Sequence, residues 1–185
     1  MKIKKYILTT IVVLMSSLSL SIAEDIEEER CEYPVWSVKN ADVGAERIAY
    51  ALVSKIYGTQ IWTVRVDEPK HKIMLTSKYW NRHPYWSWDG KRIAYAGGDE
   101  KGIQQIWVMN DDGTNALQIT KSQEDKLYPV FAPKGEKIVF IAVKKEEAFL
   151  YEVETSGKKQ PQLINKCWNI GKNTILSPVT FSNDG

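Results

Sequence analysis

Few side chains in this sequence combine the types and the spacing that enzyme chemistry requires. Asp111-Asp112 and Glu124-Asp125 are adjacent acidic pairs, and two carboxylates are what a glycoside hydrolase uses. Adjacent acids of this kind are more often solvated turn residues, and a calcium loop needs a twelve-residue pattern with a terminal glutamate that is missing here. Neither a Gly-x-Ser-x-Gly elbow nor a phosphate-binding glycine loop occurs. We therefore expect no catalytic residue, no cofactor and a protein that is not an enzyme.

The side chains that commonly bind metals are also too dispersed to form a site. His71 and His83 are not at ligand spacing with each other, nor with Cys31 and Cys167, the only two cysteines. We expect no metal ion, and structural or exposed positions for both histidines.

The first 23 residues predict a secretory signal peptide. Lys2, Lys4 and Lys5 precede an apolar run that ends at Ser21-Ile22-Ala23, the small-x-small pattern of a signal peptidase site. Serines and threonines dilute the apolar run, which argues against a membrane anchor. Residues 24–32 read as a short acidic linker. We expect a periplasmic or secreted protein with no integral membrane span after cleavage.

The composition is that of an ordinary globular protein. The 185 residues are 43% hydrophobic and 26% charged. The formal net charge is +2, and it becomes −1 once the three leader lysines are removed. A nearly neutral chain lacks the basic surface that phosphate neutralisation requires, so nucleic acid is not an expected partner.

A repeat of about 45 residues runs through the rest of the sequence. The segment 84–95, PYWSWDGKRIAY, returns at 129–140 as PVFAPKGEKIVF. A looser copy covers 34–50, and a last one begins at Val179. The segment that starts at Ile61 returns at Ile106 and at Leu150, so several parts of the unit recur in register.

Each unit is expected to form four short antiparallel strands. In the second unit the strands are expected at 85–88, 92–96, 104–109 and 116–120, because Gly, Asp, Asn and Pro separate the apolar runs. Asp89-Gly90 and Asp112-Gly113 supply the positive φ that tight hairpin turns need. A unit of this length with four strands predicts a β-propeller blade. One aromatic residue from each innermost strand should fill the seams between blades, namely Trp36, Trp86, Phe131 and Phe181.

These motifs resemble the TolB-type propeller repeat. The resemblance rests on four successive motifs: a Pro-x-aromatic-Ser-x-Asp-Gly-Lys-x-Ile-Ala-aromatic run, an Ile-aromatic-Val strand, an Asp-Gly turn and a Leu-Thr strand. The resemblance covers residues 33–185, in units of about 33–77, 78–120, 121–164 and 165–185. It implies an all-β fold, a TolB-type propeller with three complete four-stranded blades plus the first strand of a fourth. No TolB-type α/β domain stands between the leader and the repeats.

The resemblance implies six blades for a complete relative, more than these repeats supply. An open blade exposes a strand edge, so we expect either a shortened chain or assembly with another chain. In a six-bladed ring the blades that follow Cys31 and Cys167 stand opposite each other, farther apart than a disulfide allows. We expect two unpaired thiols, or pairing with another chain.

One face of such a propeller carries the short Asp-Gly turns, and the other carries longer and more variable loops. Segments 77–83, 121–127 and 165–176 gather on the loop-rich face. Within them Tyr79, Trp80, Arg82 and Trp168 are of types enriched at protein–protein hot spots. The alternative for these aromatics is burial between neighbouring blades.

The sequence favours an exported, non-enzymatic β-propeller that binds another protein at the cell envelope through its loop-rich face. TolB-type repeats are also similar to the propellers of prolyl oligopeptidase-like peptidases. The alternative is therefore the propeller portion of a secreted peptidase whose catalytic domain lies beyond Gly185. A small-ligand or glycan sensor is a third possibility.

Overall fold

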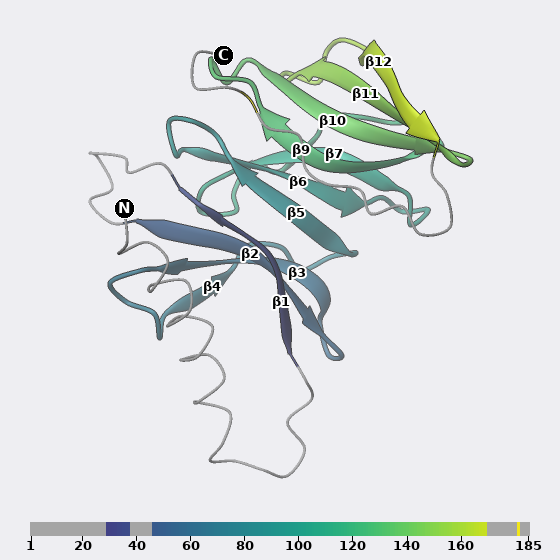
Figure 1. Ribbon diagram of the computed structural model, residues 1–185. Helices are drawn as coiled ribbons and strands as arrows, with labels where there is room; N and C mark the ends of the chain where they lie inside the picture. The colour runs from purple at the N-terminus through teal and green to yellow at the C-terminus, as the bar shows by residue number, and fades with distance from the viewer. Residues whose placement is uncertain (1–28, 38–45, 170–180, 182–185) are drawn as a thin grey trace.

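Three four-stranded antiparallel sheets lie side by side in the computed structural model, which describes residues 29–37, 46–169 and 181 (Figure 1). The first sheet contains β1 (Arg30–Trp36), β2 (Arg47–Ser54), β3 (Gly58–Arg65) and β4 (Lys72–Met74). The second contains β5 (Asn81–Trp86), β6 (Arg92–Gly98), β7 (Gln104–Asn110) and β8 (Leu117–Gln118). The third contains β9 (Asp125–Phe131), β10 (Lys137–Lys144), β11 (Glu147–Glu154) and β12 (Gln162–Asn169).

In every sheet, neighbours in sequence are neighbours in space, which is the meander of a propeller blade. The all-β fold with three blades is thereby confirmed. The expected signal peptide, most of the acidic linker and the expected first strand of a fourth blade, apart from Phe181, lie outside the described residues.

The three sheets repeat one register. Ile48 lies opposite Trp36, Ile93 opposite Trp86, and Ile138 opposite Phe131, always between the first and second strands. The sequence repeat is therefore a repeat of strand pairing as well as of residue types.

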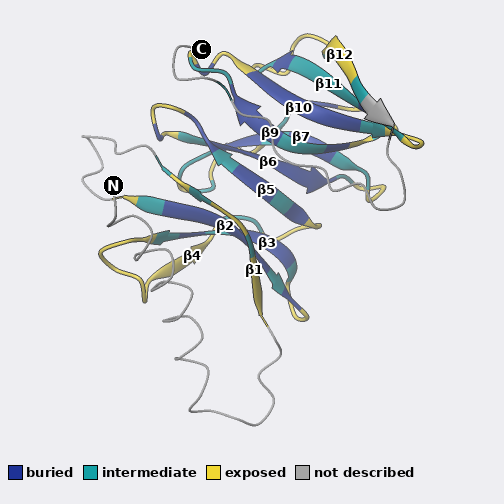
Figure 2. Ribbon diagram, viewed as in Figure 1, coloured by how far each residue is buried: buried dark blue, intermediate teal, exposed yellow. Residues whose placement is uncertain are grey.

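Apolar side chains fill both seams between the sheets. Trp86 is 3% exposed and Phe131 is fully buried, as expected for the aromatics of the innermost strands. The first seam contains Ala49, Ala51, Ile61, Trp86, Ile93, Tyr95 and Met109. The second contains Ala94, Ile106, Val108, Ile119, Phe131, Ile138, Phe140, Ala142 and Val153. The second strand of each sheet, β2, β6 and β10, is accordingly the most continuously buried (Figure 2).

The expectation for Trp36 is wrong. Its ring is 40% exposed, because no described blade precedes the first sheet to cover it. Phe181 is partly buried and lies in no described strand, so its place on a fourth inner strand stays a prediction.

An arginine crosses each seam to an aromatic ring of the next sheet. The Arg47 guanidinium lies 5.0 Å from the centre of the Trp86 ring and 2.6 Å from the Asp111 carboxylate. The Arg92 guanidinium lies 5.2 Å from the Phe131 ring and donates to the Gly135 carbonyl at 2.8 Å. Cation–π contacts of this kind add electrostatic attraction to apolar packing.

The tight turns form where Asp-Gly pairs predict them, with φ of 66° at Gly90 and 86° at Gly113. The first strand of the second sheet nevertheless ends at Trp86 and not at Trp88. Ser87 causes the early end, because its backbone and hydroxyl both hydrogen-bond to Arg92 and close the turn. Trp88 is left in the turn, 41% exposed.

Both cysteines lie inside strands and not in the loops that precede the inner strands. Cys31 is in β1 and Cys167 is in β12, and both are free thiols. The described part of the chain also holds no helix that is long and apolar enough to cross a membrane.

Candidate protein-binding surface

Tyr79 and Trp80 project from the loop between β4 and β5 on the loop-rich face. Tyr79 is 45% exposed and Trp80 is 62% exposed. Their backbone is held firmly: Gln60 Nε2 donates to the Tyr79 carbonyl at 2.8 Å, and the Gly98 amide donates to the Trp80 carbonyl at 2.9 Å. Gln104 Nε2 also donates to the Trp80 carbonyl, at 3.2 Å. The two rings are therefore presented to solvent from a fixed backbone.

Arg82 adds a positive charge beside these rings. Its guanidinium lies 5.7 Å from the centre of the Trp80 ring. The Arg82 Nε is buried and has no hydrogen-bond partner in the described part of the chain.

The turn between β2 and β3 extends the same surface. Ile56 is 73% exposed and Tyr57 is 57% exposed. Gln60 Nε2 donates to the Tyr57 carbonyl at 2.9 Å as well as to Tyr79, so one amide joins the two loops. A Cβ added to Gly58 would lie 3.5 Å from Trp80 Nε1, which places this turn directly beside the Trp80 ring. We call Ile56, Tyr57, Tyr79 and Trp80 the aromatic rim.

Sequence reasoning missed Ile56 and Tyr57. Their signal is an apolar pair in a turn just before Gly58, where polar residues are usual.

A buried polar network supports the aromatic rim from below. The Thr76 hydroxyl donates to Gln60 Oε1 at 2.7 Å, and Asn81 Nδ2 donates to the same oxygen at 2.9 Å. Asn81 Nδ2 also reaches the Lys78 carbonyl at 2.6 Å. Because Gln60 Oε1 and Asn81 Nδ2 are both hydrogen-bonded within this network, it fixes the loop that carries the rings.

A hollow of about 490 Å³ adjoins Tyr79 on this face. Its walls come from the β6–β7 loop and the β8–β9 connection, with Asp99, Glu100, Trp107 and Gln123 among the lining residues. The hollow gives a partner both apolar and polar contacts next to the aromatic rim.

The structure brings Tyr79, Trp80 and Arg82 together, but it places Trp168 elsewhere. Trp168 lies in β12 and not in a loop, with its backbone opposite Ala148. Two irregularities in the pairing let β12 follow β11 to Asn169, and the Lys166–Glu147 ion pair at 2.5 Å joins the strands. The side chain of Trp168 is outside the described part of the structure.

A second group of rings meets where the inner strands of the three sheets come together. Tyr33, His83 and Tyr128 each precede a proline, and their φ values are 54°, 54° and 53°. The His83 ring centre is 4.2 Å from that of Tyr33 and 4.0 Å from that of Tyr128. A positive φ in a non-glycine residue is strained, and here it turns one ring per blade toward the same place. We call these three residues the axial cluster.

The axial cluster suits packing better than proton transfer. His83 is only 6% exposed, and burial together with the nearby Arg82 lowers its pKa from 6.5 to about 3. Burial, with Tyr33 adjacent, raises the pKa of Tyr128 to about 12. Both groups are thus neutral near pH 7, far from the pKa that a general acid or base needs.

The acidic pairs also have structural partners. Asp111 forms the seam ion pair with Arg47, and Asp112 accepts hydrogen bonds from the Thr114 amide and hydroxyl, which lower the pKa of Asp112. Asp125 accepts from the Gln104 amide at 2.9 Å. Over the described ranges, no group of three or more His, Cys, Asp or Glu residues is placed to hold a metal ion.

Comparison with known proteins gives one sequence relative and several structural ones. The chain is 29% identical over 101 residues to the TolB homologue of Chlorobaculum tepidum, a match that spans 51% of this chain and 23% of that protein. No protein-family profile matches the sequence.

The solved structure of a TolB from Agrobacterium tumefaciens is similar with a TM-score of 0.62 and 21% identity, over 74% of this chain and 50% of that one. TolB from Acinetobacter baumannii gives a TM-score of 0.56 and 21% identity, over 68% and 31%. An acylaminoacyl peptidase from Pyrococcus horikoshii gives 0.54 and 14%, over 76% and 25%. At these identities the structural likenesses show the propeller fold. The chain spans half or less of each of these proteins.

Proposed function

We propose that this chain, a TolB-like β-propeller, is an exported and non-enzymatic protein that binds another protein at the cell envelope through the aromatic rim. The observation that carries the proposal is the pair Tyr79 and Trp80, which remain in solvent while their backbone is hydrogen-bonded in place. Rings held in position before binding lose little conformational entropy when a partner covers them. Tryptophan, tyrosine and arginine are also the residue types that most often dominate binding energy.

The proposed location rests on the sequence of the leader. Residues 1–23 have the charge, apolar run and small-x-small end of a secretory signal, which makes the chain periplasmic or secreted. The likeness to the TolB homologue supports the same compartment.

A site-specific photocrosslinking experiment tests the aromatic rim. A photoreactive phenylalanine analogue replaces Trp80 in cells that export the full-length protein, and the matched control carries it at Trp88. Trp88 is also exposed but lies in the Asp-Gly turn on the opposite face. We expect a discrete protein adduct from position 80 and none from position 88. Adducts from both positions, or none from position 80, would contradict the proposal.

The alternative of a peptidase propeller has weaker support. The likeness to acylaminoacyl peptidase is one of fold, and the acidic pairs and His83 have structural partners or a neutral, buried setting. A Gly-x-Ser-x-Gly motif encoded downstream of Gly185 would favour this alternative.

A further inference from the structure

The two seams differ at one equivalent position. It is filled in the first seam and adjoins a cavity in the second. In the first seam Asn81 lies opposite Gly97 across β5 and β6. A Cβ on Gly97 would lie 2.7 Å from Asn81 Oδ1 and 2.9 Å from Trp107 Cδ1, closer than side chains tolerate. The first seam therefore leaves no room for a side chain at Gly97.

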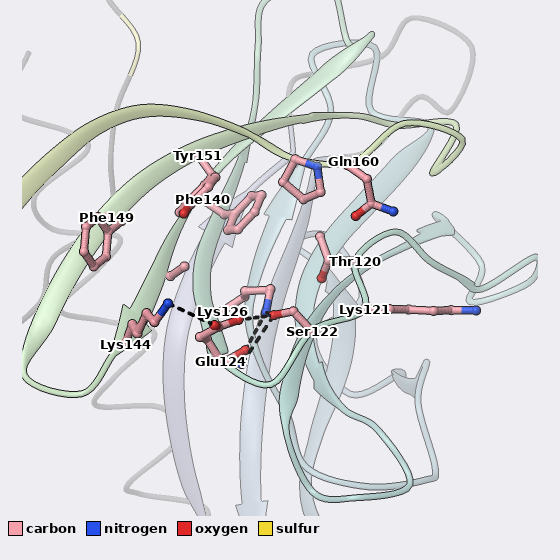
Figure 3. Close-up of a pocket in the computed structure, with 12 residues that line it drawn as sticks. Thr120, Lys121, Ser122, Glu124, Lys126, Phe140, Lys144, Phe149, Tyr151 and Gln160 are labelled. Atoms are coloured by element: carbon pink, nitrogen blue, oxygen red, sulfur yellow. Dashed lines mark hydrogen bonds and ion pairs between the residues drawn. The ribbon is translucent and has the colours of Figure 1, made fainter.

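In the second seam Lys126 takes the place of Asn81, and it lies opposite Ala142 across β9 and β10. A cavity of about 280 Å³ opens here between the β8–β9 connection and the third sheet (Figure 3). Its lining includes Phe140, Phe149, Tyr151, Lys126, Lys144 and Glu124. At this position the first seam has the neutral side chain of Asn81, whereas the second seam has the buried cation of Lys126.

The Lys126 ammonium is held in place by two hydrogen bonds and has one more N–H donor than these use. Lys126 is only 3% exposed, and its Nζ donates to the Ser122 hydroxyl and to the Glu124 carbonyl. An ammonium has three N–H donors, so one of them has no acceptor among the described residues. Burial lowers the pKa of Lys126, although Glu124, Asp125 and Asp99 oppose this effect. A carboxylate that entered the cavity would accept a hydrogen bond from the third donor and favour the charged form of Lys126.

The opposite wall of the cavity is flat and apolar. The rings of Phe140 and Tyr151 are stacked, with centres 5.8 Å apart and planes inclined by 14°. Lys144 reaches the Glu124 carboxylate at 4.0 Å, whereas Lys121 points away from the other side chains (Figure 3). Among the side chains that line the cavity, the ammonium groups of Lys126 and Lys144 outnumber the one carboxylate, Glu124, while Asp99 and Asp125 act on Lys126 from outside the lining.

We propose that this cavity binds a small carboxylic acid with a flat apolar body, whose carboxylate pairs with Lys126 while its body lies against the partly exposed rings of Phe149 and Tyr151, with the buried Phe140 stacked behind Tyr151. Such an acid could be a free metabolite or the C-terminal residue of a peptide, because both present the same chemistry. The size of the cavity, near the lower end of the range for ligand sites, suits one ring and a short acidic tail. None of the four residues of the aromatic rim lines this cavity, although Lys121 and Ser122 line both the cavity and the hollow beside Tyr79.

Titration of the purified protein with 3-phenylpropionate, followed by calorimetry and by amide NMR shifts, tests the proposal. Its neutral amide is the ligand control, and a peptide that ends in phenylalanine, with a free or an amidated C-terminus, tests the second source. The Lys126→Asn variant recreates the Asn81 of the first seam, so the fold has a precedent for it. Lys91→Asn, at an exposed lysine of the Asp-Gly turn, is the matched control.

We expect 3-phenylpropionate to bind with shifts at Ser122 and Glu124, and its amide to bind about tenfold or more weakly, as the loss of a charge-assisted hydrogen bond implies. Lys126→Asn should weaken binding of the acid by a similar factor, and Lys91→Asn should not. Tighter binding of the free-ended peptide would identify a chain terminus as the source, and its failure to bind would identify a free acid. Equal binding of acid and amide, or no shifts around the cavity of the wild-type protein, would overturn the proposal even if Lys126→Asn failed to fold.

Discussion

At the scale of single residues, three positions before prolines bring one ring from each of the described sheets together. Tyr33, His83 and Tyr128 share a positive φ, and their rings meet although the residues come from three different sheets. His83 differs from the two tyrosines of the cluster, because only its side chain can become positively charged in acid. Its burial and the neighbouring Arg82 disfavour that charge.

His83 should make the protein sensitive to acid. An unfolded histidine takes up a proton near pH 6.5, whereas folded His83 does so only near pH 3. Between these values the unfolded chain binds more protons, so the free energy of unfolding falls as the pH falls, by up to about 1.4 kcal/mol per pH unit. Above pH 6.5 His83 has no such effect, because it is neutral in both states.

The variant His83→Tyr isolates this contribution, because tyrosine already occupies the two equivalent positions. Urea unfolding measured at several pH values between about 3 and about 6.5 should show a shallower pH dependence for the variant than for the wild type. Identical slopes would mean that His83 is not buried as a neutral ring.

At the scale of strands, one pair of residues decides how tightly each seam closes. Asn81 opposite Gly97 gives a filled position in which the Asn81 Nδ2 is hydrogen-bonded, and Lys126 opposite Ala142 gives a cavity. The strand pairing is the same at both places, because each residue pair joins the first and second strands of its sheet. Packing differences of one or two side chains are therefore enough to make one seam structural and the other a candidate binding site.

Gly97→Ala should destabilise the protein by about 1–3 kcal/mol, the usual effect of overpacking, because the new Cβ would contact Asn81, Tyr95 and Trp107 at once. Chemical denaturation measures the change. The matched control is Ala142→Gly at the equivalent position, where only the cost of a strand glycine, about 0.5–1 kcal/mol, is expected. A Gly97→Ala variant as stable as the wild type would show that the first seam has room to spare.

At the scale of the whole molecule, the described sheets form a short array in which each packs through its seams against the next sheet, and the first and third sheets also touch where the Tyr33 and Tyr128 rings meet, with centres 6.1 Å apart. The stability of such an array is the sum of the sheets and of the seams between them. Apolar clusters provide most of each seam, and Arg47 and Arg92 tie the edges across to the next sheet.

Arg47→Met should loosen the first sheet from the second. It removes the cation over Trp86 and leaves the half-buried Asp111 carboxylate without its partner, at a cost of about 1–3 kcal/mol. Hydrogen exchange should become faster in β1–β4 with little change in β9–β12. Arg65→Met is the control, because its ion pair with Asp67 is exposed and within one sheet, and surface pairs contribute little. Uniform acceleration over all three sheets would indicate that they open as one unit.

Much of the fold could be predicted from sequence because it repeats. Periodic aromatics and Asp-Gly turns predict the strands, the blades and the burial of Trp86 and Phe131, and the TolB-like comparisons agree. Trp36 follows the same pattern but is exposed, since burial depends on a neighbouring blade and not on the residue. Trp88 and Trp168 were misplaced because local hydrogen bonds at Ser87 and irregular pairing along β11 set the strand ends.

The candidate site was only partly accessible from sequence. Residue type and loop position were enough to select Tyr79, Trp80 and Arg82, but not to decide whether the rings are buried or exposed. Ile56 and Tyr57 became visible only once Gln60 was seen to join two loops that are distant in sequence.

By itself, the sequence determined the architecture of the described blades, because backbone geometry and apolar periodicity act over a few residues and recur in every unit. The tertiary structure alone decided which rings meet at the axial cluster, which remain in solvent on the aromatic rim, and that Lys126 lies in a cavity. These outcomes depend on side chains from different sheets competing for the same space, and no local pattern in the chain encodes that competition.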